Sequence, residues 1–401
     1  MKRKLNLKKQ LACLYTCNFF SGLRITDAVW VALLAARGFS LLEIGIAESV
    51  FHVVSLFCEV PSGMFADMLG RKKTLVFGGA IIVIYNVMMA FAPNMFFVCL
   101  AMGLNALSNT MFSGTDTALM YDSLKQEGQT EKFIKISSNC NQINLFASAI
   151  GSLTSMLESV LHYVGFYLTS ACFEGISALA KLFLVEPVVT EAQANRDKHS
   201  LKDIPNMFIT LFKDSFNILK NCPLAVKLIA SSAVISIPAY LTKMFIQERL
   251  IELGWSNAFL FVPMLMGSGA GIFGSYLAAK LSPKSLRKFY GICAIICGVG
   301  TLTVGMASAI VSIVGMMLVQ GILEVWFIHE GQRLNDAIPS DQRATIISVD
   351  NMAYSLLMIP TSPIIGKIGD VFGNAGAGLA VLGAIVFLSG FVMLFRKRKA
   401  Q

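Results

Sequence analysis

The feature that most constrains this chain is a series of long apolar stretches that recur along almost its whole length. Most are near twenty residues long, which is about the length a helix needs to cross the hydrocarbon core of a bilayer. Because lipid cannot satisfy backbone polar groups, spanning segments this numerous must be helices. The candidate spans are residues 11–36, 41–62, 74–93, 95–120, 137–160, 166–185, 224–247, 257–281, 289–306, 308–330, 345–365 and 375–395.

Composition excludes a water-soluble alternative. Hydrophobic residues make up 55% of the 401 positions and charged residues only 14%, against about 25% charged residues in an average soluble protein. A soluble protein this apolar could not cover its surface with polar groups. The sequence therefore predicts an all-α integral membrane protein with twelve transmembrane helices, whose first partner is the lipid bilayer.

The net charge of +9 fits a membrane protein better than a nucleic-acid-binding one, because lysine and arginine collect in cytoplasmic loops. No basic patch accompanies a nucleic-acid-binding motif, so we expect no nucleic-acid partner. The nine cysteines lie mostly inside apolar stretches and form no CxxC pair, which predicts buried thiols. The apolar stretch after residues 1–10 is too long for a signal peptide and is predicted to be the first membrane helix.

The distribution of basic residues predicts the orientation in the membrane. The loops that hold little basic charge, apart from Arg37, Arg249 and Lys367, are assigned to the outside. Both termini are then cytoplasmic, and a multi-pass protein of the cytoplasmic membrane is expected. Most lysine and arginine falls on the inner side, at residues 2–9, 71–73, 125–135, 196–220, 284–288, 343 and 396–399.

A polar stretch in the middle of the chain separates two groups of six predicted spans. We expect an N-terminal six-helix bundle over residues 1–186, a cytoplasmic linker over 187–222 and a C-terminal six-helix bundle over 223–401. Within the linker, residues 200–220 show helical apolar spacing with lysines between, which predicts an amphipathic helix on the membrane surface. A disordered linker is the alternative.

The loop between spans two and three carries the most specific motif. Residues 63–73 read Gly-Met-Phe-Ala-Asp-Met-Leu-Gly-Arg-Lys-Lys, which resembles the G-x-x-x-D-x-x-G-R-K signature of the major facilitator superfamily. The resemblance implies two pseudo-symmetric bundles around a central cavity, and a secondary transporter that works by alternating access. It also implies an inner gating loop made of Gly63, Asp67, Gly70, Arg71 and Lys72.

Physical properties of these residues fit that role. Glycine permits a tight turn, Asp67 can face the positive end of a helix, and Arg71 can anchor the loop at an anionic inner leaflet. The resemblance places Asp67 opposite the start of span eleven, near Ala344 and Thr345. A basic loop with no gating role is the alternative. Residues 274–284 keep a glycine and the basic end, as expected of a degenerate internal repeat.

Ionisable residues inside a span cost about 2.5–3.5 kcal/mol or more, so they are candidates for function. Glu48, His52 and Glu59 lie within roughly a 60° arc of span two, an arrangement that suits proton carriage. In the alternative, Glu59 belongs to the gating network and Glu48 faces outer water. Arg24 and Asp27 share a face of span one, where they can pair with each other or contact substrate.

Polar side chains also mark spans four, five, ten and eleven, which the resemblance implies line the cavity. Acidic groups outnumber basic ones there, so the lining favours a cationic or zwitterionic substrate, or protons. Span six departs from this pattern, because Glu174 and Lys181 are expected to pair with each other. The candidate lining residues are Asn105, Asn109, Asp116, Asn141, Gln320, Glu324 and Asp350.

These observations predict proton-coupled export of a small amphipathic drug-like molecule. Residues 44–63 resemble a group of exporters with acidic residues in span two, some of which export tetracyclines, so a tetracycline is the specific candidate. Span four lacks the arginine and span five the proline of the best-known drug antiporters. Uptake of a sugar, nucleoside or peptide is therefore an alternative, as is a non-transporting receptor or assembly factor.

No phosphate-binding glycine loop, second zinc-protease histidine or Ser-His-Asp pattern occurs in the sequence. We therefore expect no enzymatic activity, no cofactor and no metal. The expected partners are a small-molecule substrate and protons, and the expected state is a monomer.

Overall fold

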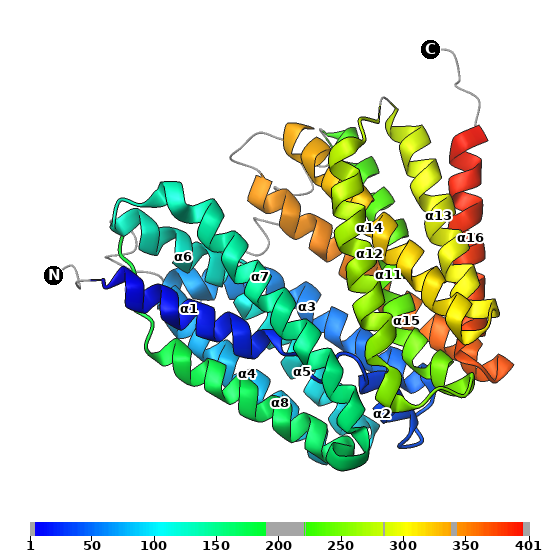
Figure 1. Ribbon diagram of the computed structural model, residues 1–401. Coiled ribbons are helices and arrows are strands. Elements are labelled where there is room, and N and C mark those ends of the chain that lie inside the picture. The colour runs from blue at the N-terminus through cyan, green and yellow to red at the C-terminus, as the bar shows by residue number, and fades with distance from the viewer. Residues whose placement is uncertain (1–4, 190–219, 221, 284, 338–342, 396–401) are drawn as a thin grey trace. The chain divides into compact units, whose positions relative to one another are not determined.

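The computed structural model describes residues 5–189, 220, 222–283, 285–337 and 343–395 (Figure 1). Within these residues all regular structure is helical, which confirms the all-α prediction. Side chains are described for most of them, with Asp67 and residues 343–348 among the exceptions. The predicted amphipathic helix over 200–220 falls outside the described residues, apart from Lys220.

Nine stretches of the described chain are long and apolar enough to cross a membrane. One of them, Thr130–Leu182, contains two long helices, α7 (Phe133–Ser152) and α8 (Glu158–Leu182), joined by a short 3₁₀ helix, η2 (Leu153–Leu157). The helices agree with a multi-pass membrane protein.

Contacts divide the chain into two compact units. Unit 1 comprises Met1–Asp27 and Val50–Phe212. Its remaining helices are α1 (Leu7–Gly22), most of α3 (Leu41–Leu69), α4 (Arg71–Phe91), α5 (Met95–Phe112), α6 (Thr115–Gln126) and the short η1 (Thr130–Lys132).

Unit 2 comprises Ala28–Ser49 and Lys213–Gln401. Its helices are α2 (Trp30–Ala35), the start of α3, α11 (Pro223–Glu252), η5 (Asn257–Phe259), α12 (Phe261–Lys280), α13 (Leu286–Met306), α14 (Ala309–Ala337), α15 (Arg343–Phe372) and α16 (Ala375–Phe395). Unit 2 thus includes Ala28–Ser49 from the first two predicted spans. The division into bundles over 1–186 and 223–401, with a linker over 187–222, stays a prediction.

Glycines explain how closely two helices of unit 2 approach each other. Gly291, Gly298 and Gly305 recur every seven residues on α13, and they meet Gly390, Gly383 and Gly376 on the antiparallel α16. A Cβ at Gly298 would lie 2.8 Å from the carbonyl oxygen of Gly383, so a larger residue would force the backbones apart. Figure 1 shows α13 and α16 side by side along their length.

The first predicted span, 11–36, is not one continuous helix. The helix α1 ends at Gly22, where a Cβ would lie 3.0 Å from the Cα of Asn144 on α7. Arg24 then adopts a left-handed backbone with φ of 40°, and the amide of Asp27 donates to the carbonyl of Arg24 in a turn. Close packing of α1 on α7 and this turn interrupt a stretch that composition alone presents as uniform.

Candidate functional site

The ionisable residues of span two lie on α3 and differ in exposure. Glu48 is 1% exposed and His52 is 4% exposed, whereas Glu59 is half-buried. Glu48 belongs to unit 2, where it interacts electrostatically with Tyr354 of α15. His52 lies in unit 1, with its ring edge-on to Phe51 at a centroid distance of 5.3 Å. The predicted shared helix face is therefore largely enclosed by protein at one end and accessible at the other.

Glu59 is joined to the polar face of α5. Its Oε1 accepts a hydrogen bond of 3.3 Å from Ser113 Oγ, just after α5 ends. One turn earlier, the exposed Asn109 donates from Nδ2 to Oδ1 of Asn105 over 2.8 Å. Ser113, Asn109 and Asn105 thus form a polar stripe that continues from Glu59, and we call these four residues the α5 stripe.

Two further predicted lining residues of unit 1 are exposed. Asp116 lies in the first turn of α6, where its Oδ1 accepts from the amide of Thr117 over 2.6 Å. Asn141 is exposed on α7. Together with the α5 stripe they give unit 1 acidic and amide groups that a polar ligand can reach.

The predicted pair in span six has other direct contacts. Glu174 Oε2 accepts from Ser21 Oγ over 2.9 Å, and Ser21 Oγ lies 2.7 Å from Ser177 Oγ. Lys181 is 6% exposed, and its Nζ lies 3.9 Å from the ring centroid of Phe112, a cation–π contact. Glu174 and Lys181 still interact electrostatically with each other. The expected pairing is therefore one part of a larger network between α8, α1 and α5.

Arg24 and Asp27 belong to the surroundings of the same network. Both interact electrostatically with Glu174, with opposite signs. Arg24 is exposed and Asp27 is half-buried, in the turn after α1. The sequence predicted that these two residues share one helix face. In the structure α1 ends at Gly22, and both residues lie in the turn that follows. The charged residues of span six, Glu174 and Lys181, could have indicated this network. The sequence analysis left them out of the candidate site because it expected them to pair with each other.

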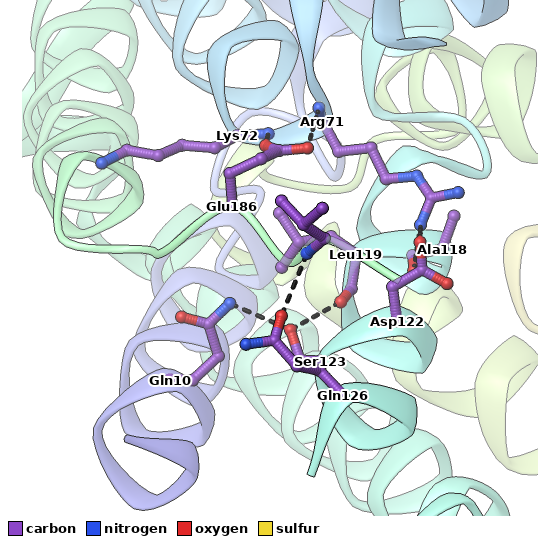
Figure 2. A network of polar contacts seen from close by, with 10 residues as sticks. Gln10, Arg71, Lys72, Ala118, Leu119, Asp122, Ser123, Gln126 and Glu186 are labelled. Carbon is purple, nitrogen blue, oxygen red and sulfur yellow. Dashed lines mark hydrogen bonds and ion pairs between the residues drawn. The ribbon is translucent and has the colours of Figure 1, made fainter. Parts of the chain in front are cut away.

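The gating-loop motif is anchored inside unit 1 by two acids that sequence reasoning missed (Figure 2). The Arg71 guanidinium forms an ion pair with Asp122 of α6 and donates to the carbonyl of Ala118 over 2.6 Å. Glu186 accepts from the amides of Arg71 at 3.0 Å and Lys72 at 2.7 Å, and so caps the start of α4. Gly70 precedes this helix with φ of 100°, a conformation that favours glycine.

These contacts revise the physical role expected of Arg71. Its side chain was predicted to anchor the loop at anionic lipid, but the guanidinium binds α6, with only 17% of the side chain exposed. The predicted contact of Asp67 with the start of span eleven lies outside the described side chains. A gating role for Gly63, Asp67, Gly70, Arg71 and Lys72 stays a prediction.

The residues after α8 are bound to the same region. Gln10 of α1 donates from Nε2 to the carbonyl of Val185 over 2.9 Å and accepts from the amide of Val185 through Oε1 over 2.9 Å. Its Nε2 also lies 3.1 Å from Ser123 Oγ of α6. The amide of Val188 donates to Gln126 Oε1 over 3.0 Å. Figure 2 shows Gln10 of α1 bonded to Ser123 of α6, and Glu186 beside the amides of Arg71 and Lys72.

In unit 2 the predicted lining residues are engaged by neighbouring helices. Gln320 of α14 donates from Nε2 to the carbonyl of Ala239 on α11 over 3.0 Å. Glu324 Oε2 accepts from Ser275 Oγ of α12 over 3.5 Å. Asp350 of α15 interacts electrostatically with Glu330 of α14, which is 3% exposed and was not among the predicted site residues.

Ionisable and amide side chains on membrane-spanning helices are typical of proteins that move ions or substrates, the membrane transporters among them. The comparisons with known proteins make this specific. The family model of the Major Facilitator Superfamily matches residues 11–359. The chain belongs to the Major Facilitator Superfamily; it is a multi-pass secondary transporter and not an enzyme.

The relatives that match leave the substrate open. The chain is 24% identical over 365 residues to the uncharacterized MFS-type transporter YxaM of Bacillus subtilis (strain 168), with 88% of each chain covered. Among solved structures it resembles nucleoside transporter NupG, with a TM-score of 0.72, 16% identity and coverage of 98% and 100% of the two chains. It also resembles a D-xylose-proton symporter, with a TM-score of 0.67, 17% identity and 97% of each chain covered. At these identities the structures show the shared fold.

Proposed function

We propose that this transporter couples the movement of a small molecule to protons and exports that molecule from the cytoplasm. The single observation that carries the proposal is the set of three ionisable residues on α3, of which Glu48 and His52 are buried and Glu59 is half-buried. Burying such groups inside a membrane helix is costly, so a functional role is the default explanation. A carboxyl group that accepts a proton on one side and releases it on the other supplies the coupling.

The substrate class follows from the charge of unit 1. Unit 1 holds the half-buried Glu59, which bonds to Ser113, and the exposed Asp116. It also holds the bonded amides of Asn105 and Asn109, and the exposed amide of Asn141. Carboxylates attract a cation, and amides hydrogen-bond to polar substituents. A cationic or zwitterionic amphipathic molecule fits both features, and a tetracycline is the specific candidate. In this mechanism substrate and proton compete for Glu59, so each cycle exchanges one for the other.

Orientation and gating complete the proposal. The distribution of lysine and arginine supports cytoplasmic termini in the cytoplasmic membrane. The loop at residues 63–73 is then the inner gate. Its anchor on α4 and α6, through Arg71, Asp122 and Glu186, would make it move as part of unit 1.

Proton movement in inverted vesicles with an imposed pH gradient tests the proposal directly. Tetracyclines, cationic dyes, sugars and nucleosides are added one at a time to vesicles that hold the parent protein, Glu59→Gln or Glu131→Gln. Glu131 is an exposed acid in η1 and serves as the matched control. We expect a drug to collapse the gradient in the parent and in Glu131→Gln, and to have no effect in Glu59→Gln.

A second candidate function is proton-coupled uptake of a nutrient such as a sugar, nucleoside or peptide. The exposed Asn109–Asn105 pair favours it, because neutral amides suit hydroxyl and base groups better than a cationic drug. Responses to a nutrient and to no drug in the same assay would select uptake. Silence with every compound would favour sodium coupling or the non-transporting alternative over both.

A further inference from the structure

The helix α8 carries two charged side chains that the proposed function does not use, Glu174 and Lys181. Lys181 is 6% exposed, whereas Glu174 is half-buried. A lysine inside a membrane helix is costly unless an opposite charge compensates it. Glu174 supplies that charge, because the two side chains interact electrostatically. The lysine is thus enclosed by protein, while its partner carboxyl remains accessible enough to exchange a proton with water.

A series of hydrogen bonds begins at Glu174 and ends at a backbone carbonyl. Glu174 Oε2 lies 2.9 Å from Ser21 Oγ of α1, and Ser21 Oγ lies 2.7 Å from Ser177 Oγ of α8. Ser177 in turn donates to the carbonyl of Cys17 over 3.3 Å. We call these groups the serine chain: the Glu174 carboxyl, the hydroxyls of Ser21 and Ser177, and the Cys17 carbonyl. All of them belong to unit 1.

The serine chain can satisfy Glu174 in both protonation states, because a hydroxyl group both donates and accepts. With Glu174 ionised, Ser21 donates to Oε2 and Ser177 donates to the carbonyl of Cys17. With a proton on Oε2, Glu174 donates to Ser21, which turns its own hydrogen toward Ser177, and Ser177 still donates to the carbonyl. Gaining or losing a proton therefore rotates hydroxyl groups and leaves no member of the chain without a partner, which would be costly in a buried site.

Three further groups on α1 and in the turn after it act on Glu174. Arg24 and Asp27 both interact with it electrostatically, with opposite signs. The thiol of Cys17 interacts electrostatically with Glu174 and Lys181, and it donates to the carbonyl of Ser177 over 3.6 Å. Because Arg24 and Asp27 oppose each other, Lys181 is the charge whose effect on Glu174 has no counterpart among these groups.

Lys181 also connects Glu174 to the proposed substrate site. Its Nζ lies 3.9 Å from the ring centroid of Phe112 on α5, and Gly79 of α4 makes room for its stem, since a Cβ there would lie 3.5 Å from Lys181 Cδ. Lys181 interacts electrostatically with the exposed Asp116 of α6 as well as with Glu174. When Glu174 binds a proton, the positive charge of Lys181 is no longer compensated there and repels a cation beside Asp116.

We propose that Glu174 is a second proton-binding group of the transport cycle, with Lys181 as its counter-ion and Ser21 and Ser177 as its hydrogen-bond partners. The inference rests on the proposed proton-coupled export and extends it. A proton from water forms an O–H bond at Glu174 Oε2, and the same bond breaks when the proton leaves. Proton and cationic substrate then oppose each other through Lys181 while bound to different carboxyl groups, in addition to competing for Glu59.

Infrared difference spectroscopy of the purified full-length protein in detergent tests the proton site without any substrate. The protein is titrated over the pH range in which it stays folded, and the C=O band of protonated carboxyl groups is followed. We expect part of this band to appear on acidification in the parent and in Glu131→Gln, and to be missing in Glu174→Gln. Glu131 is the exposed acid of η1 and serves as the matched control.

Two variants should move the midpoint of that titration in opposite directions. Lys181→Met removes the counter-ion, so the band should appear at a pH that is higher by about one to three units. Ser177→Ala removes the acceptor that Ser21 needs when Glu174 is protonated, so the midpoint should fall by up to about one unit. Ser170→Ala, at another buried serine of α8, should leave the midpoint unchanged. Thermal melting identifies the variants that are folded.

The role in the transport cycle is tested with both charges removed. The double variant Glu174→Gln/Lys181→Met leaves no uncompensated charge, so it should melt near the parent temperature. A purely structural ion pair predicts full transport for this variant. We expect it instead to move fewer protons than the parent in the inverted-vesicle assay, because one proton-binding group is missing.

Identical spectra of the parent and Glu174→Gln would overturn the proton site, whatever the substrate proves to be. A midpoint that moves in neither Lys181→Met nor Ser177→Ala would overturn the assigned counter-ion and hydrogen-bond partners. Full proton movement in the double variant would overturn the role in the cycle. If no compound moves protons in the parent, the proposed function fails, but the infrared result does not depend on a substrate and identifies that failure separately.

Discussion

The predicted lining residues of the two units differ in how exposed they are. In unit 1, Asn109, Asp116 and Asn141 are exposed, and Glu59 is half-buried and accepts a hydrogen bond from Ser113. In unit 2, Gln320 and Glu324 are each hydrogen-bonded to a neighbouring helix. Side chains of both units make hydrogen bonds within the protein, so exposure and not bonding separates them: Asn109, Asp116 and Asn141 are exposed, whereas Gln320 and Glu324 are half-buried. We therefore propose that substrate contacts unit 1 and that the polar groups of unit 2 hold neighbouring helices together.

The largest effect is expected from Glu59→Gln in unit 1. The amide keeps the size and the hydrogen bond to Ser113 but cannot carry a proton, so coupled transport should fall to background. Glu324→Gln in unit 2 is the comparison variant and should retain transport. Gradient collapse in inverted vesicles measures both. If Glu59→Gln and Glu48→Gln both keep full activity, the acids of α3 are structural and the proposed mechanism is wrong.

The next largest effect should be on stability and lies in unit 1. Arg71→Ala removes the ion pair between Arg71 and Asp122, whose side chains are only 17% and 11% exposed. Breaking a buried pair from one side typically costs about 3–5 kcal/mol. Thermal unfolding of the purified protein should show a clear loss, whereas Lys125→Ala, an exposed site on α6, should be neutral. Equal stability of the two variants would mean that the polar anchor of α4 contributes little.

Features that depend on neighbouring residues could be predicted from the sequence, whereas contacts between residues far apart in the chain could not. The helical fold and the family followed from apolar length and from the motif at residues 63–73, which are local properties of the chain. The partners of Arg71 could not be found that way, because Asp122 and Glu186 are 51 and 115 residues away. Their acidic side chains were visible in the sequence, but only packing of α4 beside α6 and the end of α8 brings them together.

The apolar pattern of the sequence also gave a wrong prediction where packing interrupts a helix. The stretch 11–36 reads as one apolar span, but the contact of Gly22 with α7 and the left-handed Arg24 break it into α1 and α2. The same limit applies to Asp370, which the sequence analysis did not single out and whose Oδ1 accepts from the amide of Leu41 at the start of α3. Its role as a cap depends on the start of α3, more than 300 residues earlier.

A smaller effect is expected when the exposed stripe of unit 1 is changed. Asn109→Leu removes a reachable amide without removing a buried partner, so substrate affinity should fall by roughly tenfold, as expected for one lost hydrogen bond to a polar ligand. Turnover at saturating substrate should change little. Asn94→Leu, which alters an amide at the helix cap of α5, is the control and should lower stability instead of affinity. Unchanged affinity in Asn109→Leu would remove the α5 stripe from the substrate site.

The smallest effect should come from Ser275→Ala in unit 2. The hydroxyl bonds Glu324 over 3.5 Å, at the long end of hydrogen-bond geometry. Its loss should therefore cost less than about 1 kcal/mol of stability and leave transport unchanged. Thermal melting and transport are measured in parallel. Ser268→Ala on the same helix is the reference, since its hydroxyl donates to the backbone carbonyl of Met264 within α12. If Ser275→Ala stops transport while Ser268→Ala does not, Glu324 needs that hydroxyl for substrate or proton binding. The polar groups of unit 2 would then take part in transport as directly as those of unit 1.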